Sequence, residues 1–465
     1  MSVDWSFVRL KDYCTKIGSG STPRGGANVY LDSGNVCLIR SQNIYNDGFS
    51  ENGLVFISDS DAEKLNNVEI ELNDVLINIT GDSVARVCLA PKDKLPARVN
   101  QHVAIIRTVK NELDPKFVRY FLTDRNTQNH LLTLAGTGAT RNALTKGMLE
   151  EFLVPKPDIL IQKKISKILS DLDEKIHLNN QINQTLESIA QTIFKSWYID
   201  FDPVRAKIAA KLEGADPEIA AMCVISGKSE AELKQMPDDD FAELQATAAL
   251  FPDELVESEL GEVPKGWELQ SLYDTAEFVN GAAFKAKDFS SNTNEGLPII
   301  KIAELKQGLS AQTKYTNLSF DQKYRVRSGD IFYSWSGSPE TSLDVFKWFG
   351  GDGWLNQHIF KINTESKGKT YFVYYLLKYL KPTLIRLATN KQTTGLGHIT
   401  VADMKSLQVI KPEEHLFLRY AKIVAPFYEK ESLLKQEIIN LAMLRDTLLP
   451  KLLSGEVSLG DVIDA

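Results

Sequence analysis

The longest regular pattern of apolar side chains in this chain occurs twice. Apolar residues recur at alternating intervals of four and three over residues 161–193, and again over residues 416–448. This spacing places them on one stripe of an α-helix, so it predicts two helices of about 50 Å that pair along a seam. The seam positions are Ile161, Ile165, Ile168, Leu172, Asn179, Ile182, Leu186, Ile189 and Ile193 in the first helix and Leu416, Tyr420, Ile423, Phe427, Leu434, Leu441, Leu444 and Leu448 in the second.

Polar residues interrupt this seam at related places. Lys175 and Lys430 occupy the same position in the two stretches, and Asn179 is a further polar member of the seam. Such interruptions lower stability but fix the register of paired helices. One helix alone could equally be an amphipathic face packed on its own domain. Two stretches that match in phase favour pairing with each other.

The regions that precede the two stretches also repeat each other. Asn100-Gln101-His102 recurs as Asn356-Gln357-His358, and the segment 74–81 recurs as 330–337, both 256 residues later. The boundary motif at 154–157 recurs at 409–412. A period this long exceeds solenoid units and indicates one duplicated module of domain plus helix. A pseudo-twofold axis between the copies would make the helices antiparallel.

Each copy begins with a head that mixes short strands and helices. Each predicted element occurs once in each head. The predicted strands are 38–44 and 299–305, 75–80 and 331–336, and 103–106 and 359–362. The predicted helices are 115–122 and 370–377, and loops follow at 136–138 and 394–397. The predicted fold is therefore two similar α+β heads joined by two long antiparallel coiled-coil helices with an internal pseudo-twofold repeat.

The pattern divides the chain into five parts. The first head covers 1–157 and its helix 158–200, the second head covers 263–412, and the last helix and tail cover 413–465. Residues 201–262 between the modules carry 5 basic and 15 acidic side chains, and we expect helical fragments and a solvated acidic linker there. The net charge of −8 thus arises mostly from this part, whereas the second head has 19 basic and 13 acidic residues. A locally basic surface suits nucleic acid, although it can also serve only solubility.

Composition and motifs exclude several classes of protein. No apolar run is long enough for a membrane span, and the four cysteines form no CxxC pair, so we expect a reduced, cytoplasmic protein without structural zinc. The phosphate-binding loop G-x-x-x-x-G-K-[ST], the G-x-S-x-G elbow, the H-E-x-x-H motif and the N/D-P-P-Y/F tetrapeptide of amino-methyltransferases are all missing. We therefore expect no catalytic residues, no metal site and no cofactor on this chain.

Polar and basic residues in the expected loops are candidates for contact with DNA. Arg and Lys recognise guanine, Asn and Gln recognise adenine, and basic or hydroxyl side chains hold phosphates. The candidates are Ser21, Thr22, Arg24, Arg40, Gln42, Asn43, Arg86, Asn100, Gln101, His102, Arg141 and Asn142 in the first head, and Lys285, Lys287, Lys301, Ser334, Trp335, Ser336, Asn356, Gln357, His358, Lys391, Gln392 and His398 in the second. The repeated triplets are identical within diverged surroundings, which favours a structural or phosphate-contacting role over base reading.

Several segments resemble the specificity subunit of type I restriction–modification systems. They are Phe194 to Val204 (FKSWYIDFDPV), Leu250 to Asp253 with Ser258 to Trp267, and Leu449 to Gly455. The first head departs from the pattern because it lacks the Pro-Lys-Gly-Trp sequence found at Pro264 to Trp267. The resemblance spans the whole chain.

The resemblance implies a non-catalytic adaptor. Each head would be a target recognition domain for one half of a split DNA sequence, with half-sites about one helical turn apart, roughly 10 bp. The helices would fix the gap and dock two methyltransferase subunits, and ATP-dependent restriction subunits would join them. S-adenosylmethionine, ATP and Mg²⁺ would then belong to those partners. Two alternatives stay open: a coiled-coil scaffold with two protein-binding heads, and a self-sufficient nuclease or methyltransferase with unrecognised motifs.

Overall fold

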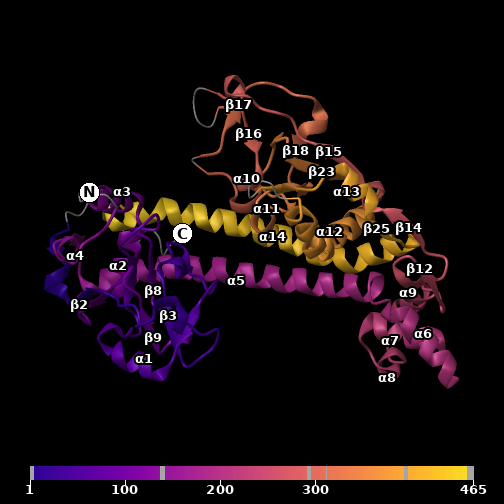
Figure 1. Cartoon of the computed structure of the whole chain (residues 1–465), viewed down its shortest axis with the longest axis horizontal. Helices are drawn as coiled ribbons and strands as arrows, with labels where there is room; N and C mark the ends of the chain where they lie inside the picture. The colour runs from indigo at the N-terminus through magenta and orange to yellow at the C-terminus, as the bar shows by residue number, and fades with distance from the viewer. Residues whose placement is uncertain (1–4, 137–141, 291–294, 311, 392–395, 458–465) are drawn as a thin grey trace. The chain divides into compact units, whose positions relative to one another are not determined.

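The chain folds into two compact units, seen in a computed structural model that describes residues 5–136, 142–290, 295–310, 312–391 and 396–457. The first unit contains residues 1–178 and 438–465, and the second contains residues 179–437. Helix α5 (Ile159–Tyr198) and helix α14 (Glu414–Leu453) each contribute one part to each unit (Figure 1). Each unit is therefore one head together with a segment of both long helices.

The head of the first unit is built from small sheets, of which the main one is antiparallel throughout. Its main sheet has the order β2-β10-β7-β8, and a second sheet has the order β6-β3-β9 with β3 and β9 parallel. The strands are β1 (Phe7–Arg9), β2 (Cys14–Ser19), β3 (Val36–Ile39), β6 (Val55–Ile57), β7 (Val75–Asn78), β8 (Val87–Leu89), β9 (Ala97–Val99), β10 (Val103–Thr108) and β11 (Leu153–Pro155). The helices are α1 (Asp59–Lys64), α2 (Pro115–Thr123), α3 (Arg125–Gly136) and α4 (Lys146–Glu150).

The head of the second unit repeats this topology. Its main sheet has the order β15-β23-β19-β21, and β16 pairs with β22 in parallel, as β3 does with β9. The strands are β14 (Glu268–Ser271), β15 (Glu277–Asn280), β16 (Leu297–Ile300), β17 (Tyr315–Thr316), β18 (Arg325–Val326), β19 (Ile331–Ser334), β20 (Ser336–Gly337), β21 (Asp344–Lys347), β22 (Gly353–Leu355), β23 (Ile359–Asn363), β24 (Gly397–His398) and β25 (Gln408–Lys411). The helices are α10 (Ile302–Gln307), α11 (Pro339–Ser342), α12 (Lys367–Thr389) and α13 (Val401–Ser406).

Four of the six predicted strands are present within a few residues, but the first of each head is wrong in its second half. Strand β3 ends at Ile39 because the Asn43 side chain accepts a hydrogen bond from the Arg40 backbone N–H at 3.0 Å and closes a 3₁₀ turn. Strand β16 ends at Ile300 because Glu304 accepts from the Lys301 backbone N–H in the same way, and α10 follows. The apolar run was misleading because a local cap outweighs β-propensity at these positions.

The predicted helix at 115–122 is confirmed as α2, whereas the one at 370–377 is part of the much longer α12. In the first head Asp124 stops α2, and its carboxylate then accepts from the backbone N–H groups of Asn126 and Thr127 in the first turn of α3. The acidic cap thus divides into two helices what the second head builds as one.

The first head keeps the tryptophan of the missing Pro-Lys-Gly-Trp sequence. Strand β1 pairs with β11 as β14 pairs with β25, and the two registers place Trp5 where Trp267 lies. Trp5 packs against the apolar cluster that contains Leu452 and Leu453 at the end of α14, whereas Trp267 stacks edge-on against Phe201 after the end of α5. The N-terminal edge of the first head is therefore the same structural element as that of the second.

Within each unit the segments of α5 and α14 pair antiparallel. In the second unit the hydroxyl of Tyr198 donates to the Leu416 carbonyl at 3.4 Å, and Asn179, earlier in α5, donates to Glu437, later in α14, at 3.0 Å. In the first unit Ile165 and Leu169 share one apolar cluster with Leu452. The predicted antiparallel pairing holds in both.

The predicted seam is shifted on α5. Ile165, Asn179, Leu416, Tyr420 and Leu434 are buried, but Ile189 and Leu444 are 40% and 46% exposed and their prediction is wrong. The other apolar positions of the predicted seam are half-buried, and its polar members Lys175 and Lys430 are exposed. The neighbouring Leu169, Asn183, Ala190 and Phe194 are buried instead. The reason is a third partner, because α2 packs on this helix pair in the first unit and α12 does so in the second. The buried face of α5 is therefore rotated toward the head, relative to the face expected if α5 and α14 packed only on each other.

The expected helical fragments at 201–262 are confirmed, but the expectation of a solvated linker is wrong for the first part of this segment. Four helices form there, α6 (Asp202–Glu213), α7 (Pro217–Ser226), α8 (Glu230–Leu233) and α9 (Asp238–Ala248), and a small apolar cluster holds α7, α8 and α9 together. The buried Lys207 ammonium donates to Glu218 at 2.6 Å and to the Phe251 carbonyl at 2.9 Å. A buried cation with two acceptors indicates a folded subdomain rather than a linker. The hairpin of β12 (Leu255–Ser258) and β13 (Gly261–Pro264) follows it.

Candidate nucleic-acid interface

In each head, one edge brings together the segments that hold most of the candidate residues. The chain leaves β2 and immediately passes the backbone of the triplet 100–102, and it leaves β15 and passes 356–358. Glycine is required at the crossing in both heads, because a Cβ on Gly20 would overlap the carbonyl oxygens of Val99 and Asn100, and one on Gly281 would overlap that of Asn356. We name these regions the triplet edges of the two heads.

The same backbone hydrogen bonds build both triplet edges. The N–H of Asn100 donates to the Ile39 carbonyl and that of Asn356 to the Ile300 carbonyl, both at 3.1 Å. The His102 carbonyl accepts from Ile79 at 2.9 Å, as the His358 carbonyl accepts from Trp335 at 3.4 Å.

A further backbone hydrogen bond is shared by both edges. The N–H of Leu144 donates to the Ile79 carbonyl at 2.9 Å, and the N–H of Ile399 donates to the Trp335 carbonyl at 2.8 Å. The duplicated sequence thus gives one backbone frame on which different side chains are mounted.

In the first head, the side chains at this edge form a continuous hydrogen-bonded chain. The Thr22 hydroxyl contacts the Gln101 Oε1, the Gln101 Nε2 lies 2.9 Å from the His102 Nε2, and the His102 Nδ1 lies 2.6 Å from the Thr80 Oγ1. Gln101 is exposed and His102 is half-buried. This arrangement fixes the orientation of polar groups that face solvent.

The second head keeps the amide–imidazole pair and changes its surroundings. The Gln357 Nε2 lies 3.2 Å from the His358 Nε2, and the Trp335 ring packs 5.7 Å from the His358 ring. The Trp335 indole N–H donates to the Asn280 side chain at 3.1 Å. His398 takes the place of Ala143 beside this edge, because Ser336 pairs with His398 as Thr80 pairs with Ala143.

A basic residue lies beside the triplet edge of each head, at the end of the parallel strand. Arg40 follows β3 with its guanidinium 5.2 Å from the Tyr30 ring centre, and Lys301 follows β16 with its ammonium 5.5 Å from the Phe289 ring centre. Arg40 and Gln42 also donate to the Gly53 carbonyl, at 2.5 and 3.1 Å. Cations held over aromatic rings keep their charge at the surface while their direction is restricted.

The remaining candidates differ in accessibility. Arg24, Asn142, Lys285, Lys287, Lys391 and His398 are exposed, and Ser21, Arg86 and Ser336 are half-buried. Arg86 packs over the Tyr45 ring at 4.7 Å, and Lys391 forms an ion pair with Asp403. Arg141 and Gln392 lie outside the described residues.

Three candidates are corrected by their burial. Asn43 and Ser334 are fully buried and Asn100 is buried, so their side chains are not available to DNA. Asn43 closes the turn after β3, Ser334 lies inside β19, and the Asn100 side chain accepts from the His102 backbone N–H at 3.2 Å. Asn43 and Asn100 thus use their polar side chains to hold the frame, whereas the Ser334 hydroxyl has no hydrogen-bond partner among the described residues.

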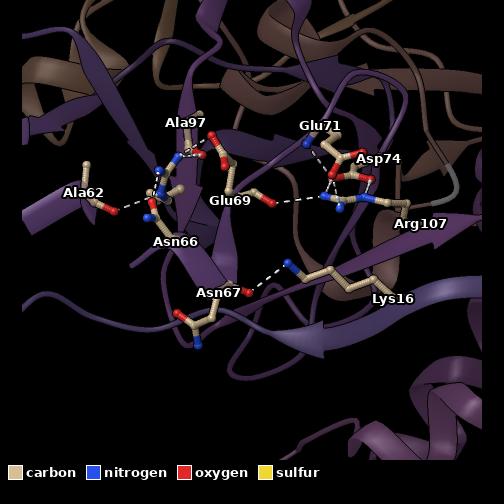
Figure 2. Close-up of polar contacts among 10 residues, drawn as sticks. Lys16, Ala62, Asn66, Asn67, Glu69, Glu71, Asp74, Ala97 and Arg107 are labelled. Carbon is tan, nitrogen blue, oxygen red and sulfur yellow. Dashed lines mark hydrogen bonds and ion pairs between the residues drawn. The ribbon is translucent and has the colours of Figure 1, made fainter. Parts of the chain in front are cut away.

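Two further arginines of the first head form hydrogen bonds and ion pairs within the head (Figure 2). Arg107 donates to both carboxylate oxygens of Asp74 at 2.8 Å, and Arg98 donates to Glu69 and Asn66 at 3.1 and 2.8 Å. Figure 2 also shows Lys16 directed to the Asn67 carbonyl. Such paired cations contribute little to a DNA-binding surface, so the net charge of a head overstates its binding potential.

Sequence reasoning missed Thr80 and the aromatic supports Tyr30 and Phe289. Thr80 was inside the repeated segment 74–81, so the repeat carried a signal for it. The aromatic residues gave no such signal, because the contacts that place them under Arg40 and Lys301 form only in the fold.

The described residues contain no cluster of His, Cys, Asp and Glu with the geometry of a metal centre. Among these same residues, no helix is both long and apolar enough to cross a membrane.

Comparison with known proteins identifies the class. The profile of the type I restriction modification DNA specificity domain matches residues 2–188 and again residues 264–442. The chain belongs to this family: it is a specificity subunit with two DNA recognition domains, and subunits of this kind are not themselves catalytic.

Individual relatives agree along nearly the full length. The chain is 29% identical to the type I restriction enzyme HindI specificity subunit of Haemophilus influenzae, over 98% of this chain and 100% of that protein. It is 23% identical to the MjaIX specificity subunit of Methanocaldococcus jannaschii, over 98% and 94% of the two chains. The crystal structure of a type I restriction–modification S subunit from M. genitalium has the same fold, with a TM-score of 0.53, 15% identity and coverage of 97% and 96%.

Proposed function

We propose that this chain recognises a split DNA sequence, with the triplet edge of each head contacting one half. The observation that carries this proposal is the pairing of a constant frame with variable side chains. Both edges are built by the same backbone hydrogen bonds, yet Thr22, Ile79 and Ala143 in one head stand at the positions of Ala283, Trp335 and His398 in the other. Constant framework and varied surface suit two readers of different half-sites.

The proposal includes docking of two methyltransferase subunits on the long helices and recruitment of ATP-dependent restriction subunits. Neighbouring exposed apolar side chains on these helices support it, because Ile439 and Met443 lie one turn apart on α14 in the first unit and are both exposed. A contiguous exposed apolar patch is typical of a surface that a partner covers. S-adenosylmethionine, ATP and Mg²⁺ would be bound by those partners, and the assembly would act on DNA in the cytoplasm.

The test is to purify the chain with the methyltransferase subunit encoded beside it and to map methylated adenines by single-molecule sequencing. We expect one motif of two half-sites with a fixed gap. Replacing residues 1–157 by another first head should change one half-site only. A continuous motif, or a change in both halves, would contradict the proposal.

The salt dependence of DNA binding distinguishes the proposed function from the scaffold alternative. When a protein neutralises DNA phosphates, counterions are released, so the logarithm of the binding constant falls linearly with the logarithm of the salt concentration. A stable complex without such DNA binding would favour a scaffold of protein-binding heads. Methyl transfer or cleavage by the chain alone would favour the self-sufficient enzyme.

A further inference from the structure

The triplet edges contain one polar pair that does not differ between the heads. Gln101 with His102 and Gln357 with His358 have the same sequence, the same position after β9 and β22, and the same contact between amide nitrogen and imidazole Nε2, at 2.9 and 3.2 Å. Around them the side chains have diverged. A group kept in two readers of different sequences suits a feature that every DNA sequence shares.

The hydrogen-bond inventory of Gln101 determines what it can offer. Its Oε1 accepts from Thr22, one of its two N–H bonds points at His102 Nε2, and His102 Nδ1 then donates to Thr80. One amide N–H and the Thr80 hydroxyl hydrogen remain to donate outward. If the amide is turned by 180°, donors and acceptors exchange along the chain, but one amide N–H and one hydroxyl are still left.

This inventory favours a phosphate over a base. Bidentate recognition of adenine by Gln requires both an amide donor and an acceptor directed at the base, whereas the Gln101 oxygen is directed at the Thr22 hydroxyl. A phosphate oxygen only accepts, so it suits the amide N–H and the hydroxyl hydrogen that this site leaves free to donate. We propose that Gln101 donates to a DNA backbone phosphate, and that Gln357, which has the same neighbours in sequence and the same amide–imidazole contact, does so in the second head. His102 and His358 are then positioning residues that orient the amides. This proposal rests on the proposed function of the triplet edges.

A neutral phosphate contact has a distinctive signature. Loss of a Lys or Arg contact lowers affinity and also reduces the slope of log affinity against log salt, because fewer counterions are released. Loss of an amide donor lowers affinity and leaves that slope unchanged. The sequence motif should also stay the same, since phosphates carry no base identity.

The test uses the full chain in complex with its methyltransferase subunit and a duplex containing the mapped target. We expect Gln101→Ala and Gln357→Ala each to weaken binding about tenfold, the size of one hydrogen bond to a charged group. The salt slope, the methylation motif and the thermal unfolding midpoint should not change. The matched control is Gln245→Ala, an exposed glutamine on α9, which should bind as the unmodified chain does.

A double-mutant cycle tests the positioning role. His102→Ala should weaken binding to a similar extent, and adding Gln101→Ala should cause little further loss, because the two side chains act as one unit. Fully additive losses would overturn the positioning role. An altered motif in one half-site would show base reading and overturn the phosphate assignment.

Failure of this inference can be told apart from failure of the proposed function. Arg24→Glu and Lys285→Glu place a negative charge beside the two edges and should weaken DNA binding if the edges face DNA. Should these variants weaken binding while the glutamine variants do not, only the phosphate contact is wrong. Should all four bind normally, DNA meets the heads elsewhere.

Discussion

In each unit a cluster of charged side chains, which we call the joint, connects the head to both long helices, and the central charge has the opposite sign in the two units. In the first unit one carboxylate, Asp173 of α5, is held at 2.9 Å by Arg119 of the head and at 2.8 Å by Arg445 of α14. In the second unit one ammonium, Lys347 of the head, is held at 2.9 Å by Glu187 of α5 and at 2.6 Å by Glu431 of α14. Each joint therefore needs a charged side chain from both copies of the repeat.

The equivalent positions show how the inversion arose. With the offset of 255 residues that relates the helices, Tyr120 corresponds to Tyr375, but Arg119 and Asp173 correspond to Tyr374 and Tyr428. In the second unit these two rings lie 4.3 and 4.7 Å from the Lys347 ammonium, where in the first unit an ion pair lies. At these two positions the first unit thus has an ion pair, and the second unit has two rings that flank the ion-paired Lys347 ammonium.

The largest effect is expected from Lys347→Ala. The Lys347 side chain is only 3% exposed, and its loss would leave Glu187 and Glu431 facing each other with little solvent. Removing one partner of a buried charge cluster costs about 3–5 kcal/mol. The measurement is urea unfolding of the full chain, with the exposed Lys287→Ala as control. A loss below about 1 kcal/mol would mean that water enters the joint freely.

A somewhat smaller loss, about 2–3 kcal/mol, is expected from Asp173→Ala, because the freed Arg119 is buried but Arg445 is partly exposed and can be solvated. Asp171→Ala on the same helix is the control, since its ion pair with Lys167 lies in solvent and is worth at most about 0.5 kcal/mol. Equal losses from both variants would refute the buried character of the first joint.

The two joints should respond to acid in opposite directions. Burial alone raises the pKa of Asp173, but the charge of Arg119 and the hydrogen bonds from Arg445 and Tyr120 outweigh burial and bring the pKa below its usual 3.8. Asp173 therefore stabilises the fold above about pH 3.8, and this contribution is lost as the pH falls through the lowered value. Burial raises the pKa of Glu431 above 4.5 although Lys347 opposes it. The protonated form of Glu431 therefore stabilises the fold below pH 4.5, and this stabilisation is lost as the pH rises through the raised value.

Unfolding free energy measured from pH 3 to 7 tests this contrast. Asp173→Asn should flatten the loss of stability at the acid end, and Glu431→Gln should flatten the decline above pH 4.5. Identical pH profiles for the two variants would remove the distinction between the joints.

The smallest effect is expected at a helix position where pattern and structure disagree. Leu444 belongs to the predicted seam but is 46% exposed, whereas Leu434, ten residues earlier on α14, is 4% exposed. Leu434→Ala should cost about 2–4 kcal/mol and Leu444→Ala less than about 1 kcal/mol. Comparable losses in thermal unfolding would restore the predicted seam.

The sequence by itself determined the duplication, the two long helices, the central strands of both heads and the triplets. These features depend on local periodicity and on self-similarity, which are written directly in the residue order. It also indicated Gln101 and Gln357, because an identical triplet stands out within diverged copies.

Only the tertiary structure decided which face of α5 is buried, which charges meet in the joints, and that Asn43 and Ser334 are internal. Each of these depends on a third element, such as α2 or α12 against the helix pair, or a cap that closes a turn. Asp173 and Arg445 lie 272 residues apart, and their pairing follows from folding rather than from any local pattern. Hydrophobic periodicity specifies that a face is buried, but the partners that cover it are selected by packing in three dimensions.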